Sequence, residues 1–378
     1  MYLSCLLLAF LPLALGGSPQ EHFGDSSRTS PLAACAPLPP RASPPESVHD
    51  LRIDDIKVIA ALGDSITAGL GAKGIVRGDP PSIENIMEDR GVSFSMGGDP
   101  DALTLPNLIQ YYRQDLVGAS MGSHLTEICY GPWCPPFQYR PSDNMNAAQS
   151  GAMASNLEYE LTYLITRLRT EQAVDFENDF KLITIFIGNN DACFGCEPFS
   201  GHTYLSPELF EMAIRALLEK IHLNVPRAVV NLMMGFNVSQ VWDLTHDDPY
   251  CSKLRNSGLV FECTCAFLSP ILRTLMDTII QSYNERLASI AKSYQDRQDP
   301  GFAVIVDPLL KNVRIQDWTL EHLSNVDCFH PTVQAHEVLA KGVWHNLFRS
   351  SEDKLNAVAP DEDIPIWCPT NESRIMMT

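Results

Sequence analysis

Four short apolar runs recur along the chain, at residues 56–62, 180–187, 227–236 and 302–310. They are rich in aliphatic residues and show no regular alternation of polar and apolar positions. Runs of this length without alternation are typical of strands that are buried on both faces of a sheet. The pattern therefore predicts four buried strands.

Longer stretches with helical periodicity follow these runs. In residues 206–224 the apolar positions fall on one helix face, at Leu209, Ala213, Leu217 and Ile221. The same rule predicts helices within residues 146–170, 267–294 and 331–348, and the last opens with Pro331 at a favoured first-turn position. Strands that alternate with such helices predict an α/β fold, in which helices cover both faces of a parallel sheet.

Several stretches depart from this alternation. Residues 17–50 are rich in Pro, Ser and Ala, and we expect an extended leader there. Residues 71–145 are too long for a plain connector and are interpreted as a binding region over the sheet edge. The folded domain is therefore predicted to span residues 51–349, followed by an acidic tail over residues 350–378, which Cys368 ties down.

The N-terminal segment predicts secretion. Residues 1–16 form an apolar run, without Lys or Arg, that ends in small residues and is too short to span a bilayer. This pattern is typical of a cleaved signal peptide, so we expect a secreted, extracellular protein without a membrane span. Of the eleven cysteines, Cys5 would leave with that segment, and the remaining ten suit a set of disulfides. Two sequons, at Asn237 and Asn371, are candidate glycosylation sites.

Composition and charge narrow the class of partner. The chain has 378 residues, of which 45% are hydrophobic and 19% charged, as in a folded globular protein. Its net charge of −19, from 27 Lys and Arg against 46 Asp and Glu, argues against nucleic acid and anionic lipid as partners. His322, His336 and His345 show no metal-like spacing with carboxylates, and we expect neither a metal nor a cofactor.

A serine follows the first predicted strand directly. Ser65 lies in LGDSITAG, residues 62–69, at the edge of the sheet where active sites usually lie. A serine nucleophile needs a histidine base that is oriented by a carboxylate. Asp327 and His330 stand three residues apart in NVDCFHPT, close enough for the carboxylate to reach the imidazole Nδ1–H. The alternative is a turn-forming serine, a surface aspartate and a helix-capping histidine.

Ester hydrolysis by a serine also needs hydrogen-bond donors for the oxyanion. Asn190 follows the second predicted strand in GNND, and its side-chain amide could serve as such a donor. Gly151, in NAAQSGA, offers a backbone N–H at close approach. Taken alone, each is equally well a strand-end turn or a helix-packing glycine. Together with Ser65, Asp327 and His330, they predict a hydrolytic site.

These four motifs, in this order, resemble the sequence blocks of the GDSL or SGNH hydrolases. The stretch 90–112, RGVSFSMGGDPDALTLPNLIQYY, and the late WCPT are similar to the phospholipase B branch, which has membrane-associated members. The resemblance covers about residues 50–348. It implies a three-layer α/β/α, flavodoxin-like fold with a central parallel sheet and a metal-free serine esterase acting on acyl esters or phospholipids.

By position, the resemblance makes Ser65 the nucleophile and its backbone N–H one oxyanion donor. Gly151 and Asn190 would supply the other donors, and Asp327 and His330 would complete the triad. Ile66 stands where the family often has Leu, and Asn189 fills a variable position. Membrane-bound members of the branch have several repeats and a terminal span, whereas this chain shows one unit.

Competing interpretations concern another serine and the cysteines. Ser120 lies in GASMG, which fits the Gly-x-Ser-x-Gly elbow, but the preceding residues have helical spacing, so we favour a Gly-rich surface turn. For Cys193 with Cys196, and for Cys263 with Cys265, disulfides are favoured over zinc or a redox dithiol. Two pairings are hypotheses: a short loop between Cys129 and Cys134, and a Cys328–Cys368 bond that braces the loop of His330.

The sequence as a whole predicts a secreted serine esterase of phospholipase B type. Its substrates would be phospholipids or lysophospholipids, met transiently at a membrane or micelle surface. The alternatives are a carboxylesterase for other acyl or carbohydrate esters, and a catalytically silent binding protein on the same scaffold. Apolar and aromatic residues within 71–145 favour acyl chains or, equally, ordinary packing: Phe94, Met96, Tyr111, Tyr112, Trp133 and Phe137.

Overall fold

The computed structural model describes residues 32–75, 81–82, 85–129, 131, 134–135, 139–195, 206–257, 263–359 and 364–378. The predicted signal peptide, Cys196, Trp133 and Phe137 lie outside the described residues. The strands are β1 (Ile56–Gly63), β2 (Met87–Glu88), β3 (His124–Leu125), β4 (Phe180–Phe186), β5 (Ala228–Met233) and β6 (Phe302–Asp307). The helices are α1 (Ser65–Ala68), α2 (Leu105–Tyr112), α3 (Leu157–Thr170), α4 (Asn189–Phe194), α5 (Pro207–Asn224), α6 (Gln240–Thr245), α7 (Pro249–Asn256), α8 (Thr264–Leu268), α9 (Pro270–Gln295) and α10 (Val333–Asn346).

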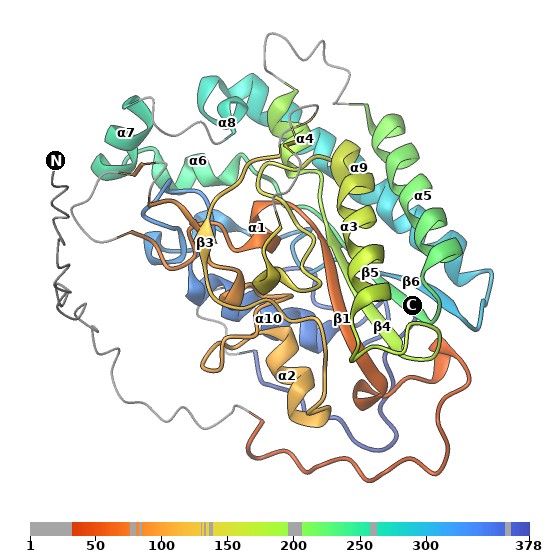
Figure 1. Ribbon diagram of the computed structural model, residues 1–378. Helices are drawn as coiled ribbons and strands as arrows, with labels where there is room; N and C mark the ends of the chain where they lie inside the picture. The colour runs from red at the N-terminus through yellow and green to blue at the C-terminus, as the bar shows by residue number, and fades with distance from the viewer. Residues whose placement is uncertain are drawn as a thin grey trace, which may run out of the picture.

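The central sheet contains the four predicted strands. They are parallel and lie in the order β1-β4-β5-β6 (Figure 1). Gly63 pairs with Phe186, so the carboxyl ends of β1 and β4 meet at one edge. The residues that leave these strands are therefore brought together there.

Helices cover both faces of this sheet. The ring of Phe302 stacks on His222 of α5 and meets Tyr294 of α9 edge to face. Five residues later on the same strand, Asp307 accepts a 2.7 Å hydrogen bond from Asn346 of α10. Because positions five apart on a strand point to opposite faces, α5 and α9 lie on one side and α10 on the other (Figure 1). The predicted three-layer α/β/α architecture is confirmed.

Two helix boundaries differ from the predictions. Residues 146–150 run as an extended segment beside β1, where Ala147 N–H donates to Ala61 O at 2.9 Å and Gln149 N–H donates to Gly63 O at 3.0 Å. The backbone of this segment therefore bonds to the edge strand β1 and forms no helix, and α3 begins only at Leu157. Helix α10 begins at Val333 after the N-cap Thr332, and Pro331 instead forms an isolated bridge with Leu323.

Residues on both sides of the predicted domain, 51–349, also pack into the protein. In the predicted leader, Leu32 and Val48 are fully buried. In the predicted tail, Ile375 is buried, and Lys354 Nζ donates to the carbonyl oxygens of Val306 and Thr378 at 2.8 and 2.6 Å. Both segments therefore contribute to the core that surrounds the sheet.

Disulfides join distant parts of the chain. The predicted Cys328–Cys368 bond is wrong, because Cys368 pairs with Cys35 and Cys328 pairs with Cys251. The short-loop Cys129–Cys134 bond is confirmed. Cys193 bonds to Cys263, and Cys265 is disulfide-bonded as well. Such bonds are typical of oxidising compartments.

The described residues show neither a metal-binding cluster nor a membrane-spanning helix. In that part of the chain no group of three or more His, Cys, Asp or Glu side chains is placed to hold a metal ion. Among the helices described above, none combines the length and the apolar character needed to cross a bilayer.

Much of the long stretch 71–145 packs into the protein. Phe94 and Met96 are fully buried, and Phe94 stacks on His336 and meets Phe186 edge to face. Tyr112 stacks on Trp344 of α10. For these side chains the structure favours ordinary packing over a lipid-binding surface.

Candidate active site

Ser65 begins helix α1, directly beyond the end of β1. Asp64 caps this helix by accepting a hydrogen bond from Ile66 N–H at 3.0 Å. A side chain at Gly63 would place its Cβ only 2.6 Å from Phe186 O, so this approach of β1 to β4 requires glycine. Because Ser65 is the first helical residue, its backbone N–H has no hydrogen-bond partner within the helix.

Ser65, His330 and Asp327 form one hydrogen-bonded chain. His330 Nε2 lies 2.6 Å from Ser65 Oγ, and His330 Nδ1 lies 2.6 Å from Asp327 Oδ2. A carboxylate can only accept, so Nδ1 carries the proton and Nε2 is free to accept one from the serine hydroxyl. All three residues are buried, His330 with only 1% of its surface exposed. The arrangement can deprotonate the serine.

The loop around His330 is held from several sides. Asp327 Oδ1 accepts hydrogen bonds from the backbone N–H groups of Phe329 and His330, at 2.8 and 3.0 Å. Cys328, between the two predicted catalytic residues, has φ +55° and is bonded to Cys251 of α7. The predicted brace of this loop therefore exists, with a different cysteine as its anchor.

Gly151 and Asn190 lie at the same edge as Ser65. Gln149 N–H donates to Gly63 O, which places Gly151 two residues further on, level with Ser65. Gly151 has φ +83°, a conformation that favours glycine. Asn190 Nδ2 donates to Ala152 O at 3.0 Å, and its second N–H proton remains for another acceptor. The structure thus brings all five sequence-predicted site residues to one edge.

Comparison with known proteins shows the family. Residues 59–343 match the model of the GDSL-like Lipase/Acylhydrolase family, which is more than half of the chain. The chain belongs to this family. Membership confirms the resemblance and places the chain among the carboxylic ester hydrolases.

The chain is also similar to curated proteins and solved structures. It is 30% identical over 362 residues to phospholipase B1, membrane-associated, from Rattus norvegicus, and 29% identical over 360 residues to that of Homo sapiens. Each match covers 91% of this chain but only 23% of the relative, so the chain spans about a quarter of the length of these relatives. Axe2, an acetylxylan esterase from Geobacillus stearothermophilus, is 17% identical with a TM-score of 0.37, covering 78% of this chain and 95% of that one. Phospholipase A1 from Streptomyces albidoflavus is 15% identical with a TM-score of 0.35, covering 74% and 94%.

Two buried carboxyl groups support the site and were not assigned a role from sequence. Both oxygens of Asp191 accept from Ala154 N–H, at 3.1 and 3.3 Å, and burial raises the pKa of Asp191 to about 7. Glu160 of α3 accepts from Gly63 N–H at 2.8 Å, and burial raises its pKa well above the usual value. Asp191 follows Asn190 directly, which was its only sequence signal. Glu160 lies on a helix far away in sequence and gave none.

An apolar pocket adjoins the serine and histidine. Its cavity volume is about 50 Å³, and it is lined by the neighbours of the two residues, namely Ile66, Phe329 and Pro331. Leu310, Trp318 and Leu339 complete much of its wall. The described cavity is small, and its lining suits an aliphatic group rather than a polar one.

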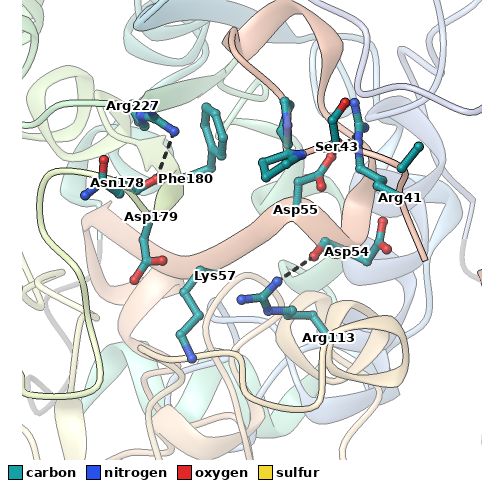
Figure 2. Close-up of a pocket in the computed structure, with 13 residues that line it drawn as sticks. Arg41, Ser43, Asp54, Asp55, Lys57, Arg113, Asn178, Asp179, Phe180 and Arg227 are labelled. Atoms are coloured by element: carbon teal, nitrogen blue, oxygen red, sulfur yellow. Dashed lines mark hydrogen bonds and ion pairs between the residues drawn. The ribbon is translucent and has the colours of Figure 1, made fainter.

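A larger cavity, of about 450 Å³, lies at the opposite end of the strands (Figure 2). It is lined by residues that precede or begin the strands, such as Lys57, Phe180 and Arg227. Its charged groups are largely engaged with their neighbours, since Arg113 donates to Asp54 O and Arg227 to Asn178 O (Figure 2). None of the five predicted site residues lines it.

Ser120 does not form a second nucleophilic site. It is fully buried, and its Oγ donates to Arg90 O at 2.9 Å. No histidine contacts it among the hydrogen bonds of the described residues. The predicted surface location is wrong, because Ser120 is fully buried and the turn packs against β1, where a Cβ on Gly118 would lie 2.0 Å from Ile59 O. The GASMG turn is a packing feature.

The two sequons lie in different surroundings. Asn371 is exposed, and its Oδ1 accepts from Arg52 Nη1 at 2.7 Å. Asn237 is half-buried, and its Oδ1 accepts from Gln281 Nε2 at 2.8 Å. Glycosylation of either residue stays a prediction.

Proposed function

We propose that this chain is a serine esterase that hydrolyses the acyl ester bonds of phospholipids and lysophospholipids. The observation that carries the proposal is the hydrogen-bonded chain from Asp327 through His330 to Ser65, with 2.6 Å between the atoms at each step. Family membership supports ester hydrolysis, and the similarity to phospholipase B1 supports a lipid as the acyl donor.

In the proposed mechanism, Ser65 Oγ attacks the carbonyl carbon of the ester while its proton passes to His330 Nε2. Asp327 keeps the imidazole in the required tautomer and stabilises the imidazolium that forms. The negative charge on the carbonyl oxygen is stabilised by the N–H groups of Ser65 and Gly151 and by the Asn190 amide. His330 then protonates the leaving alcohol, and water releases the fatty acid from Ser65 by the reverse sequence of proton transfers.

We also propose that the protein is secreted and meets its substrate at a membrane or micelle surface. The apolar run at residues 1–16 and the disulfides, such as Cys251–Cys328 beside the site, support an oxidising compartment. The net charge of −19 favours zwitterionic over anionic lipid surfaces.

The test compares three substrates. The full chain and its Ser65→Ala variant are assayed on phosphatidylcholine, lysophosphatidylcholine and a short p-nitrophenyl ester, and free fatty acid or nitrophenol is measured. We expect release from both lipids by the wild type and none by the variant. Activity on the short ester alone would move the substrate to other acyl esters. A folded wild type that turns over none of the three would favour a binding protein on this scaffold.

Replacing Asn190 with alanine is expected to lower kcat by about 10²–10³-fold, the usual effect of losing one oxyanion donor. KM should change little, because the amide is proposed to act on charge that develops only in the transition state. Steady-state kinetics on the short ester measure both constants. Asn224→Ala, at the exposed end of α5, is the matched control and should keep the wild-type values. A loss confined to KM would remove Asn190 from the oxyanion hole.

A further inference from the structure

Four ionisable side chains form a buried cluster beside the turn that carries Gly151. The cluster consists of Glu88, Arg90, His124 and Asp143. The side chains of Glu88 and Arg90 are 1% exposed, that of Asp143 is fully buried, and that of His124 is 14% exposed. Charges buried to this extent are costly unless they are paired, so the balance within the cluster matters.

Arg90 binds the extended segment that leads to the site. Its Nη1 donates to Asn146 O at 2.9 Å and its Nη2 to Ala148 O at 2.8 Å. The same segment is hydrogen-bonded to β1 on its other side, through Ala147 and Gln149. Arg90 therefore holds this segment against the strand that ends at Ser65.

Glu88 binds the residue that precedes Gly151. Its Oε1 accepts from Ser150 Oγ at 2.6 Å, and its Oε2 accepts from Arg90 Nε at 2.8 Å. One carboxylate thus links the guanidinium to the turn from which the Gly151 N–H projects. A shift of the Glu88 carboxylate would move this turn through its hydrogen bond with Ser150 Oγ.

The surroundings of His124 determine its protonation state. Its Nδ1 lies 2.9 Å from Leu125 O, which can only accept. Its Nε2 lies 3.1 Å from Asp143 Oδ1 and 3.5 Å from Glu88 Oε2, which are also acceptors. A histidine donates from both nitrogens only as the imidazolium. With His124 charged, two cations balance two carboxylates; with His124 neutral, one buried carboxylate is left without a counter-charge.

We propose that protonated His124 is a positioning residue for the Ser150–Gly151 turn of the oxyanion hole, acting through Glu88 and Asp143. This inference rests on the proposed esterase function for its kinetic consequence, but not for the protonation state itself. His124 contacts no reacting atom in this scheme. It neutralises the cluster that holds the Gly151 N–H in place.

The direction of the pKa shift agrees with this geometry. Burial by itself lowers the pKa of His124, but the hydrogen bonds to Asp143 and Leu125 O and the charge of Glu88 outweigh burial and the opposing charge of Arg90. The net shift is upward from 6.5. A raised pKa means that the stabilisation is complete below the unfolded value and is lost as the pH rises through the folded value. We therefore expect kcat to decline at alkaline pH as His124 loses its proton.

The kinetic test compares His124→Gln with the wild type over a range of pH, using the short ester. Glutamine is neutral at every pH, so kcat should fall by about 10-fold or more with little change in KM, and the alkaline decline should disappear. Ser150→Ala, which removes only the hydroxyl that joins Glu88 to the turn, should lower kcat in the same way. His222→Gln is the matched control, because His222 pairs with Asp299 at 2.9 Å on α5, away from the site, and should keep the wild-type profile.

A second measurement needs neither activity nor a variant. In wild-type protein with labelled histidine and backbone nitrogen, NMR should show His124 as an imidazolium at pH 6.5 and the Gly151 amide shifting together with the His124 titration. If the wild type hydrolyses no ester, the proposed function fails, and this coupling still decides the inference. A neutral His124 at pH 6.5, a Gly151 amide that ignores its titration, or wild-type kinetics in a folded His124→Gln would each overturn it.

Discussion

Ser65→Ala is expected to lower kcat for an acyl ester by about 10⁶-fold, the loss known for removal of a serine hydrolase nucleophile. The reason is that the alanine methyl group cannot attack the carbonyl. His330 Nε2, which lies 2.6 Å from Ser65 Oγ in the wild type, would then have only water to deprotonate. Substrate binding should survive, because the proposed oxyanion donors are unchanged. A stopped assay of fatty acid release with a high enzyme concentration measures the residual rate.

The matched control is Ser120→Ala. It removes a buried hydroxyl that donates its proton to Arg90 O, so it should reduce the free energy of unfolding by about 1–3 kcal/mol. The activity per folded molecule should stay near that of the wild type. A Ser65→Ala variant that keeps more than a few per cent of the activity, or a folded Ser120→Ala variant without activity, would contradict the assignment of the nucleophile.

Asp327→Asn is expected to lower kcat by about 10⁴-fold, through the tautomer of His330. Asp327 Oδ1 accepts from the backbone N–H groups of Phe329 and His330, so the amide oxygen of an asparagine would occupy that position. Its NH₂ group would then face His330 Nδ1, which would have to accept. The imidazole proton would move to Nε2, and Nε2 could no longer take the proton of Ser65.

Kinetics on the short ester and the thermal transition together test this prediction. KM and the melting temperature should stay close to the wild-type values, because the asparagine keeps the hydrogen bonds of the loop. Asp317→Asn, which changes an exposed carboxylate paired with Arg314, is the control and should behave as the wild type. A loss of less than about 10-fold in Asp327→Asn would show that another group orients His330.

The sequence predicts the sheet well, because its strands are buried on both faces. Such strands are apolar without interruption, and a parallel sheet needs intervening helices that show their own period. The candidate site follows for a similar reason. Ser65 and Asn190 come directly after strands, so a parallel sheet places both at the edge where its strands end. Asp327 and His330 are three residues apart, so their side chains can pair within one loop.

What the sequence did not reveal depends on contacts between distant segments. Residues 146–150, NAAQS, include two alanines, which favour a helix, but the edge of β1 binds their backbone instead. Cys251 lies 77 residues before its partner Cys328, and no spacing rule distinguishes it from Cys368. The proposed role of His124 depends on its contacts with Glu88 and Asp143, which come from other segments of the chain.

The bond between Cys35 and Cys368 has a mechanical consequence. It joins residues 333 positions apart, with their Cα atoms 5.3 Å from each other. A pulling force applied to the chain on both sides of this pair would run through one covalent crosslink. The sheet, the loop of His330 and the turn of Gly151 all lie between the two cysteines in sequence and would carry none of the load. Tension between the two ends of the chain would therefore leave the geometry around Ser65 and His330 undisturbed.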